Sequence, residues 1–320
     1  MSVLNTTFNS SLTMFILIGI PGLEDAHFWI AFLLCFVYLM AIMGNCTIVF
    51  IIKMESSLHE PMYFFLAMLA ALDILVVNSV IPKMLGIFWF DAREISFNAC
   101  LVQMFCIHSV SAMESTILVA MAFDRYVAIC NPLRHKSILT SSIVAKIGLV
   151  AVIRGAALMA PLPCLIKRLP YCRATVLSYS YCLHQDVMKF SCADISVNII
   201  YGLIVIISAM GLDSLLIFLS YFLILRAVLR LSWEARLKAF STCISHLCAV
   251  LIFYIPFIGL SMVHRFGKRS APIIAIVMAN VYLLVPPVLN PMVYGIKTKQ
   301  IRQRIIKAFH RNATRPELFD

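Results

Sequence analysis

The chain has 320 residues, of which 62% are hydrophobic and only 13% are charged, and its mean hydropathy is +0.95. A water-soluble domain cannot cover its surface with so few charged groups, so the composition predicts a polytopic membrane protein. The formal net charge of +11 would also suit a nucleic-acid-binding protein. The basic residues gather at the ends of apolar segments, however, so membrane topology explains them and no nucleic-acid partner is expected.

The first segment, residues 1–27, contains no Lys or Arg and carries two N-glycosylation sequons, at Asn5 and Asn9. A basic n-region and a small-residue cleavage site are both missing from residues 1–19, so the first apolar segment is expected to act as the targeting signal. We therefore predict that residues 1–27 are extracellular and glycosylated at Asn5 and Asn9.

Seven apolar segments follow, each long enough to cross a membrane. The first is uncharged throughout, and at about 1.5 Å per residue it spans a hydrocarbon core of about 30 Å. We predict an all-α membrane protein, a seven-helix transmembrane bundle over residues 28–296. The predicted spans are 30–52, 62–85, 97–129, 143–166, 197–229, 239–263 and 272–296.

The distribution of basic residues predicts the orientation of this bundle. The loops 125–136 and 226–238 and the tail from residue 297 are basic, and by the positive-inside rule they face the cytoplasm. Some Lys and Arg residues fall on the predicted extracellular side. Part of them lie in a long loop, and the charges of long loops have less influence on topology than those of short loops. We expect a multi-pass plasma-membrane protein with its N-terminus outside and its C-terminus in the cytoplasm.

The tail, residues 297–320, has a helical pattern of its own. Ile301, Ile305 and Phe309 recur every four residues among cations. Such a pattern is typical of a short amphipathic helix that lies on the lipid surface, here on the cytoplasmic side.

An acid and a base stand together where the third span ends, in the triplet Asp124-Arg125-Tyr126. A hydrogen-bonded Asp/Arg pair holds a guanidinium beside lipid at low cost, so the triplet is a candidate switch. The alternative is that Arg125 only anchors the helix end. Arg125 follows Glu114 by about three helical turns, so the two residues share one face of the span, which we expect to be the bundle interior.

Two carboxyl groups are predicted at mid-membrane depth, Asp73 and Glu114. Both are costly if ionised, so they are expected either to share a proton or to bind a sodium ion, with Asn45 and Asn290 supplying further oxygen atoms. The alternative is two protonated carboxyls hydrogen-bonded to the Asn side chains. No other cofactor is expected.

Arg154 and Asp213 are the remaining charges inside predicted spans. Intramembrane charges are usually paired or face the bundle interior. Arg154 can pair with a carboxylate or extend its guanidinium to the membrane surface, and the sequence leaves both alternatives open.

Four of the eleven Cys residues are predicted to be extracellular: Cys100, Cys172, Cys182 and Cys192. Thiols in that environment form disulfides, and four of them allow three pairings between which the sequence does not choose. The even spacing of the last three predicts a stapled lid between the fourth and fifth spans.

Four motifs in the expected spans resemble signatures of the odorant receptors, a branch of the rhodopsin-like seven-helix family. The extra Cys pair and the segment His264-Arg265-Phe266 resemble its class I, fish-like group. The motifs are PMYFFLA at 61–67 leading to Asp73, MAFDRYVAICNPLRH at 121–135, KAFSTCISHL at 238–247 and PVLNPMVY at 287–294.

The resemblance implies disulfides Cys100–Cys182 and Cys172–Cys192. It also implies a stimulatory, olfactory-type heterotrimeric G protein as partner and a rise in cyclic AMP. On activation, Arg125 would leave its acid partner to meet two tyrosines. The implied switch residues are Asp124, Arg125, Tyr126, Tyr221, His246 and Tyr294.

The sixth span departs from the wider rhodopsin-like pattern, because it reads Phe253-Tyr254-Ile255-Pro256 where many relatives have Cys-Trp-x-Pro. Tyr254 is expected to replace that Trp as a ligand-sensing residue. The alternative is an aromatic side chain that only packs above the Pro256 kink.

Class I receptors resemble detectors of carboxylic acids, which makes Arg265 the foremost candidate for ligand binding, since its planar guanidinium pairs bidentately with a carboxylate. His108, Ser261 and Gln185 are expected to complete a small polar pocket for an organic ligand, together with Tyr254. The alternatives are that Arg265 is a solvated loop cation and that His108 is a satisfied core histidine.

Other functions have less support in the sequence. A receptor for an endogenous metabolite acid outside the nose would carry the same motifs. A transporter usually shows an internal repeat, which this chain lacks. An enzyme is not expected, because no nucleophile, base and orienting group converge on one face and no metal-spaced His/Cys set occurs.

Overall fold

The computed structural model describes residues 13–171, 176–266, 272–297 and 301–304. The predicted sequons at Asn5 and Asn9, together with Cys172, Ile305 and Phe309, lie outside these ranges. The side chain of Arg265 also lies outside the described part, although its backbone belongs to a helix.

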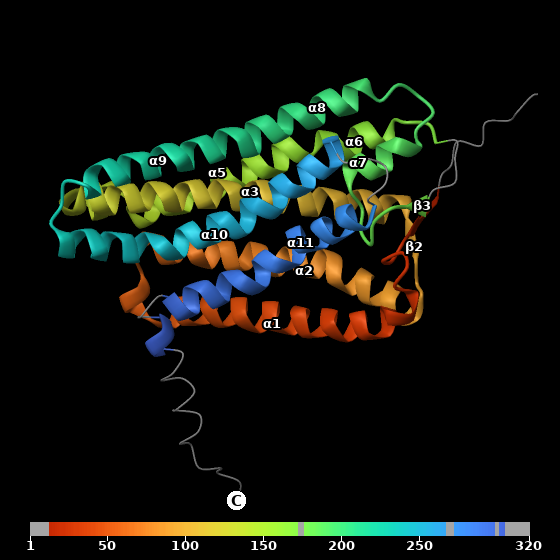
Figure 1. Cartoon of the computed structure of the whole chain (residues 1–320). Helices are drawn as coiled ribbons and strands as arrows, with labels where there is room; N and C mark the ends of the chain where they lie inside the picture. The colour runs from red at the N-terminus through yellow and green to blue at the C-terminus, as the bar shows by residue number, and fades with distance from the viewer. Residues whose placement is uncertain (1–12, 172–175, 267–271, 298–300, 305–320) are drawn as a thin grey trace, which may run out of the picture.

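Within the described residues, seven helices are long and apolar enough to cross a membrane, and they lie side by side along one axis (Figure 1). The predicted seven-helix fold is therefore confirmed. In chain order the spans are α1 (His27–Met54), α2 (Pro61–Phe90), α3 (Phe97–Cys130), α5 with α6 (Ser141–Met159, Pro161–Lys167), α8 with α9 (Ser196–Ile206, Leu212–Val228), α10 (Trp233–Phe266) and α11 (Pro272–Lys297).

Local chemistry explains several helix boundaries. Pro61 occupies the first turn of α2, where its missing N–H costs nothing. The Ser96 hydroxyl accepts a hydrogen bond from the Ala99 N–H at the start of α3, and Thr140 caps α5 in the same way.

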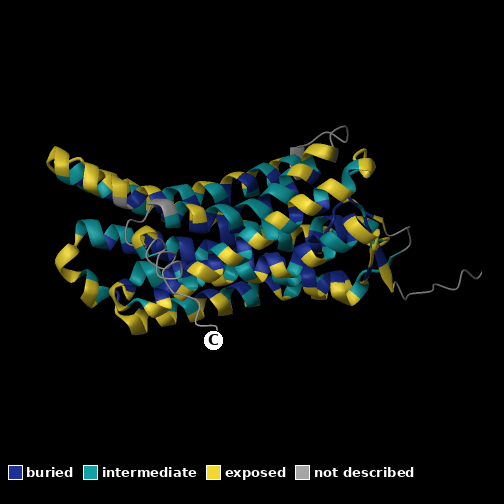
Figure 2. Cartoon of the chain, turned by 90° about the horizontal axis from the view of Figure 1, so that it is seen from below, coloured by how far each residue is buried: buried dark blue, intermediate teal, exposed yellow. Residues whose placement is uncertain are grey.

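Helix α3 is the central element of the bundle. In its most apolar segment 67% of the residues are buried, compared with 28% in α1. Apolar side chains on the outer faces stay exposed in the absence of lipid, while buried residues lie between the helices (Figure 2). This inside-out pattern is what a lipid solvent requires.

Two spans are interrupted. The fourth breaks between α5 and α6, where Pro161 starts a new helix. The fifth contains a π-helical turn, η5 (Ile207–Gly211), between α8 and α9. A π turn leaves backbone carbonyls without their usual helical partners and often lies at a functional site.

The predicted loop 226–238 was too long. Helix α9 runs to Val228 and α10 already begins at Trp233, because the residues after Trp233 are mostly strong helix formers that continue the sixth span beyond the membrane.

A small sheet covers one end of the bundle and was not predicted. Strand β1 (Met14–Leu17) pairs antiparallel with β2 (Glu94–Ser96) and parallel with β3 (Val176–Leu177). We call this the lid end. The opposite end, which carries Asp124, Arg125 and Tyr126, is called the triplet end.

Only the first turn of the predicted tail helix is described, and residues 301–304 are helical. Ile301 is fully buried in the core, and Arg304 pairs with Glu55, with 3.0 Å between Nη2 and Oε2. The tail is thereby fixed to the loop between α1 and α2.

The remaining short helical segments lie in the connections. They are η1 (Glu24–Ala26), η2 (Ser56–Leu58), η3 (Pro132–Arg134), α4 (His135–Ile138), α7 (His184–Val187) and η4 (Met188–Phe190).

Candidate functional site

The lid is tied down from several sides. Cys100 at the start of α3 forms a disulfide with Cys182, the pairing that the resemblance implied. The Cys182 N–H donates to Gln103 Oε1 at 2.9 Å, and the Tyr181 hydroxyl donates to the Ala279 carbonyl on α11 at 2.8 Å. The segment before α7 is therefore held at a fixed depth between α3 and α11.

The other predicted pair is described at one member only. Cys192 is disulfide-bonded, while Cys172 lies outside the described residues. The two backbone segments next to these cysteines are paired. Tyr171 and Ser191 form an antiparallel β-bridge, and the Cys192 N–H donates to the Pro170 carbonyl at 3.0 Å.

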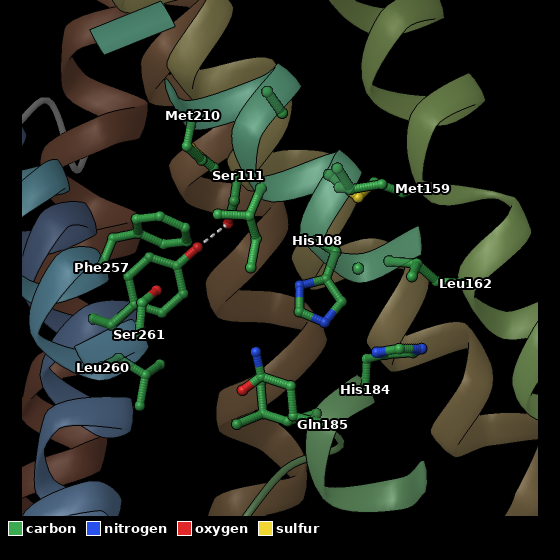
Figure 3. A pocket seen from close by; sticks show the side chains of 16 residues that line it. His108, Ser111, Met159, Leu162, His184, Gln185, Met210, Phe257, Leu260 and Ser261 are labelled. Carbon is green, nitrogen blue, oxygen red and sulfur yellow. Dashed lines mark hydrogen bonds between the residues drawn. The ribbon is translucent and has the colours of Figure 1, made fainter. Parts of the chain in front are cut away.

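A cavity of about 90 Å³, which we call the ligand pocket, lies beneath the lid. An engineered cavity of about 150 Å³ holds benzene, so this volume suits a molecule of a few carbon atoms. Its walls come from α3, α5, α6, α7, α8, η5, α10 and α11 (Figure 3). The apolar lining includes Met159, Leu162, Val205, Phe257 and Leu260.

The polar lining of the ligand pocket is concentrated near the lid. His108, His184 and Gln185 gather on one side, and Tyr282 donates to the Ser111 hydroxyl at 2.6 Å on the other (Figure 3). The Nε2 atoms of His108 and His184 are buried and have no hydrogen-bond partner among the described residues. Buried polar atoms are normally paired, so these two nitrogens have capacity for a ligand or water.

The sequence-predicted ligand residues do not all line this pocket. His108, Gln185 and Ser261 do. Tyr254 does not, because it lies one turn closer to the triplet end than Phe257 and is bonded elsewhere. Arg265 follows Ser261 by one helical turn in α10, but its side chain is outside the described part.

His184 was missed by the sequence analysis, although it directly precedes Gln185. It is 5% exposed. Burial lowers its pKa to about 4, and a hydrogen bond with the Asn198 side chain, which favours the protonated ring, opposes that shift. A neutral imidazole therefore faces the ligand pocket. The ring lies beside Gly202 of α8, at ordinary van der Waals distance.

Deeper in the bundle, Arg154 is paired rather than extended to the membrane surface, which answers the question that the sequence left open. Its Nη1 lies 2.8 Å from Asp213 Oδ2 and 2.5 Å from Thr116 Oγ1. Its Nη2 donates to the Ser208 carbonyl at 2.9 Å, a group that belongs to the π turn η5.

Ser115 extends this network to α10. Its hydroxyl lies 2.7 Å from Asp213 Oδ2 and 2.8 Å from the Tyr254 hydroxyl, and it also contacts the Ala209 carbonyl at 3.2 Å. We call Ser115, Thr116, Arg154, Asp213 and Tyr254 the transmission network, since it joins α3, α5, α9 and α10 just below the ligand pocket.

Asp73 is fully buried and accepts hydrogen bonds from Asn290 Nδ2 at 3.0 and 3.4 Å. The Glu114 carboxyl is buried as well. Asn45 donates to the carbonyls of Ala41 and Pro287, and among the described residues the side-chain oxygens of Asn45 and Asn290 have no donor. Oxygen atoms without donors fit a hard cation such as sodium.

At the triplet end, both oxygens of Asp124 are engaged. Oδ2 accepts from Arg125 Nη2 at 2.6 Å, and Oδ1 lies 2.8 Å from His135 Nε2 on α4. Tyr126 packs beside Ile224 and Val228 of α9.

The tyrosines that were expected to receive Arg125 lie nearby. The Tyr221 hydroxyl is 2.7 Å from His246 Nδ1, while His246 Nε2 lies 3.1 Å from the Leu118 carbonyl. The Tyr294 hydroxyl is buried and has no partner in the described part of the chain. This hydroxyl is therefore free to form a new hydrogen bond if the helices move.

The sequence and fold were compared with known proteins. A family model described as "Olfactory receptor" matches residues 34–312. The human protein named Olfactory receptor 51E1 is 67% identical over 94% of this chain and 95% of its own length. The human Olfactory receptor 51E2 is 59% identical over 94% of both chains.

A solved structure has the same fold. The crystal structure of squid rhodopsin matches with a TM-score of 0.75 at 16% identity, over 95% of this chain and 93% of that one. At that identity the likeness concerns the fold alone.

Proposed function

The chain belongs to the olfactory receptor family, and on this basis we propose that it detects a small carboxylic acid in the ligand pocket and raises cyclic AMP through a stimulatory heterotrimeric G protein. Membership makes it a multi-pass plasma-membrane receptor rather than an enzyme, with a ligand and a heterotrimeric G protein as partners. In the proposed orientation the lid end faces outside and the triplet end faces the cytoplasm.

The observation that carries the proposal is the pair of unpartnered imidazole nitrogens beneath the lid. In neutral His108 and His184, each Nε2 can donate to a carboxylate oxygen or accept from an acid hydroxyl. Arg265 follows Ser261 by about one helical turn in the sequence, and its guanidinium would supply the charge that a carboxylate needs. The apolar remainder of the pocket limits the ligand to a short carbon chain.

Activation is proposed to be a population shift. A ligand transmits only the difference between its affinities for the resting and active bundles. Tyr282 and Phe257 line the pocket. Tyr254 lies about one turn of α10 deeper in the bundle than Phe257, and its hydroxyl is hydrogen-bonded to Ser115. Contraction of the pocket would pull on this contact and swing α10 at its internal proline, Pro256.

At the triplet end the same motion would free Arg125 from Asp124 and allow it to meet Tyr221 and Tyr294. The resting partners are those observed here, with Arg125 held at 2.6 Å. Outward movement of α10 would then open a cleft for a helix of the G protein.

The test is a cyclic AMP panel of straight-chain acids of increasing length, in cells supplied with the stimulatory olfactory G protein. Short acids should activate the receptor, and Arg265→Ala should abolish the response while surface expression holds. Arg168→Ala is the matched control, an exposed arginine at the lid end that does not line the ligand pocket. An unchanged acid response in Arg265→Ala would refute the binding mode, and no cyclic AMP response to any acid would refute the function.

We further propose a sodium ion at Asp73, with Glu114, Asn45 and Asn290 around it. Support comes from the donor-free oxygens of the two Asn side chains. Replacing sodium by choline should change agonist potency in the wild type and have no effect in Asp73→Asn. A wild-type potency that is independent of sodium would favour protonated carboxyls instead.

A further inference from the structure

A second cavity, of about 350 Å³, lies at the triplet end and is separate from the ligand pocket. The start of α2 forms one wall, and α4 with the start of α5 forms the other. Since Pro61 and Ser141 both line it and both begin membrane-spanning helices, the cavity sits at the membrane edge. We call it the edge pocket.

The edge pocket is apolar on part of its surface. Phe64, Leu139 and Val144 are among its lining residues. Leu139 and Val144 are buried, and Phe64 packs against the bundle core, so this wall faces the bundle interior. Because the cavity lies at the membrane edge, a ligand whose head occupies it can leave its acyl chains in the surrounding lipid.

The polar part of the edge pocket is rich in nitrogen-bearing side chains. Lys136 is an exposed cation, His59 and His135 contribute imidazole rings, and Glu60 is the carboxylate among the described lining residues. Three nitrogen-bearing side chains around one cavity suit a ligand with several anionic oxygens. The Glu60 carboxylate repels an anionic ligand, so replacing Glu60 by a neutral residue tests whether the ligand is an anion.

Both histidines are already oriented by protein contacts through Nε2. The His59 Nε2 lies 3.1 Å from the Ile52 carbonyl, and the His135 Nε2 lies 2.8 Å from Asp124 Oδ1. Because an oxygen acceptor requires the proton on Nε2, Nδ1 is the nitrogen left to serve a ligand in each ring. A ring that carries its proton on Nε2 accepts at Nδ1, so a hydroxyl group of the ligand can donate there.

We propose that the edge pocket binds the phosphate-bearing headgroup of an acidic membrane lipid. The argument rests on the proposed orientation, in which this end faces the cytoplasm, where the leaflet is anionic. The volume exceeds what a lone carboxylate needs, and the position at the membrane edge favours a lipid over a soluble phosphate ester.

The position of His135 links this site to the switch. The same imidazole lines the edge pocket and contacts Asp124, whose other oxygen pairs with Arg125. A ligand hydroxyl that donates to His135 Nδ1 fixes the tautomer in which Nε2 carries the proton, and this tautomer donates to Asp124. The lipid thereby stabilises the arrangement in which α4 is docked against the end of α3.

The experiment measures binding of dioctanoyl phosphatidylinositol 4,5-bisphosphate to the purified full-length receptor by native mass spectrometry. Lys136→Gln should weaken binding by about fivefold, the effect of about 1 kcal/mol per cation near an anionic surface. Glu60→Gln should tighten binding by about twofold or more, because it removes a like charge. A misfolded variant cannot produce that gain.

Three controls can overturn the proposal. Lys53→Gln removes an exposed cation at the same end that does not line the cavity, and a loss equal to that of Lys136→Gln would show general charge attraction only. Unchanged binding by Glu60→Gln would show that the headgroup does not enter the cavity. Equally tight binding of inositol trisphosphate, which has no chains, would refute a lipid. None of these outcomes depends on the acid response, so failure of the proposed function would be seen separately.

Discussion

The ligand pocket and the transmission network lie one above the other and are both built from buried polar groups, yet they differ in how completely those groups are paired. In the network, Asp213 Oδ2 accepts hydrogen bonds from Arg154 and Ser115, and the Ser115 hydroxyl is also hydrogen-bonded to the Tyr254 hydroxyl. In the pocket, His108 and His184 each keep an unpartnered nitrogen. Unpaired buried atoms are costly unless a ligand completes them, so the first region stabilises the bundle and the second is left for recognition.

The largest expected effect comes from breaking the network. Arg154→Met leaves the 4% exposed Asp213 without its cation, which should lower the free energy of unfolding by about 3 kcal/mol, because an uncompensated charge stays buried. Thermal denaturation of the purified receptor measures this loss. The double variant Arg154→Met/Asp213→Leu should recover much of it, and a double variant less stable than Arg154→Met would contradict the ion-pair explanation.

A smaller effect is expected from acidifying the lid. The pKa of His184 is lowered to about 4 from an ordinary 6.5, so between these values the unfolded chain binds a proton that the folded lid excludes. Stability should therefore fall as pH falls through this window, by about 2 kcal/mol between pH 7 and pH 5.

The measurement is the melting temperature at the two pH values. His184→Gln should reduce the difference between them, whereas His59→Gln, at the triplet end, should keep it. An identical acid sensitivity in wild type and His184→Gln would remove His184 as the cause.

The smallest effect is expected from Tyr254→Phe, which deletes only the hydroxyl bonded to Ser115. The loss should be about 1 kcal/mol of stability. Because the contact joins α3 to α10, basal cyclic AMP should rise while ligand affinity stays within about twofold. Lower affinity with unchanged basal signalling would place Tyr254 in ligand binding, as the sequence alone suggested.

The sequence predicted the spans well, because length and hydropathy decide them almost independently of tertiary contacts. The disulfide between Cys100 and Cys182 came from family resemblance, since spacing alone left the pairing open. The sheet at the lid end was missed because β1 and β3 are far apart in the chain and only long-range pairing defines them.

The partner of Arg154 was equally out of reach of the sequence. Asp213 reaches it from another helix, and the π turn η5 rotates the fifth span in a way that regular helical periodicity does not anticipate. His184 was missed because nothing in its local pattern separates a pocket-facing histidine from a solvated one.

The contrast between unpaired and paired groups is tested most directly by measuring acid potency and melting temperature together for His108→Leu and Ser115→Ala. His108→Leu should lower potency by about tenfold or more, the value of a hydrogen bond to a charged ligand, with little change in melting temperature. Ser115→Ala should lower the melting temperature. If His108→Leu instead destabilises the receptor as much as Ser115→Ala and leaves acid potency unchanged, His108 is a core residue and the assignment of the ligand pocket is wrong.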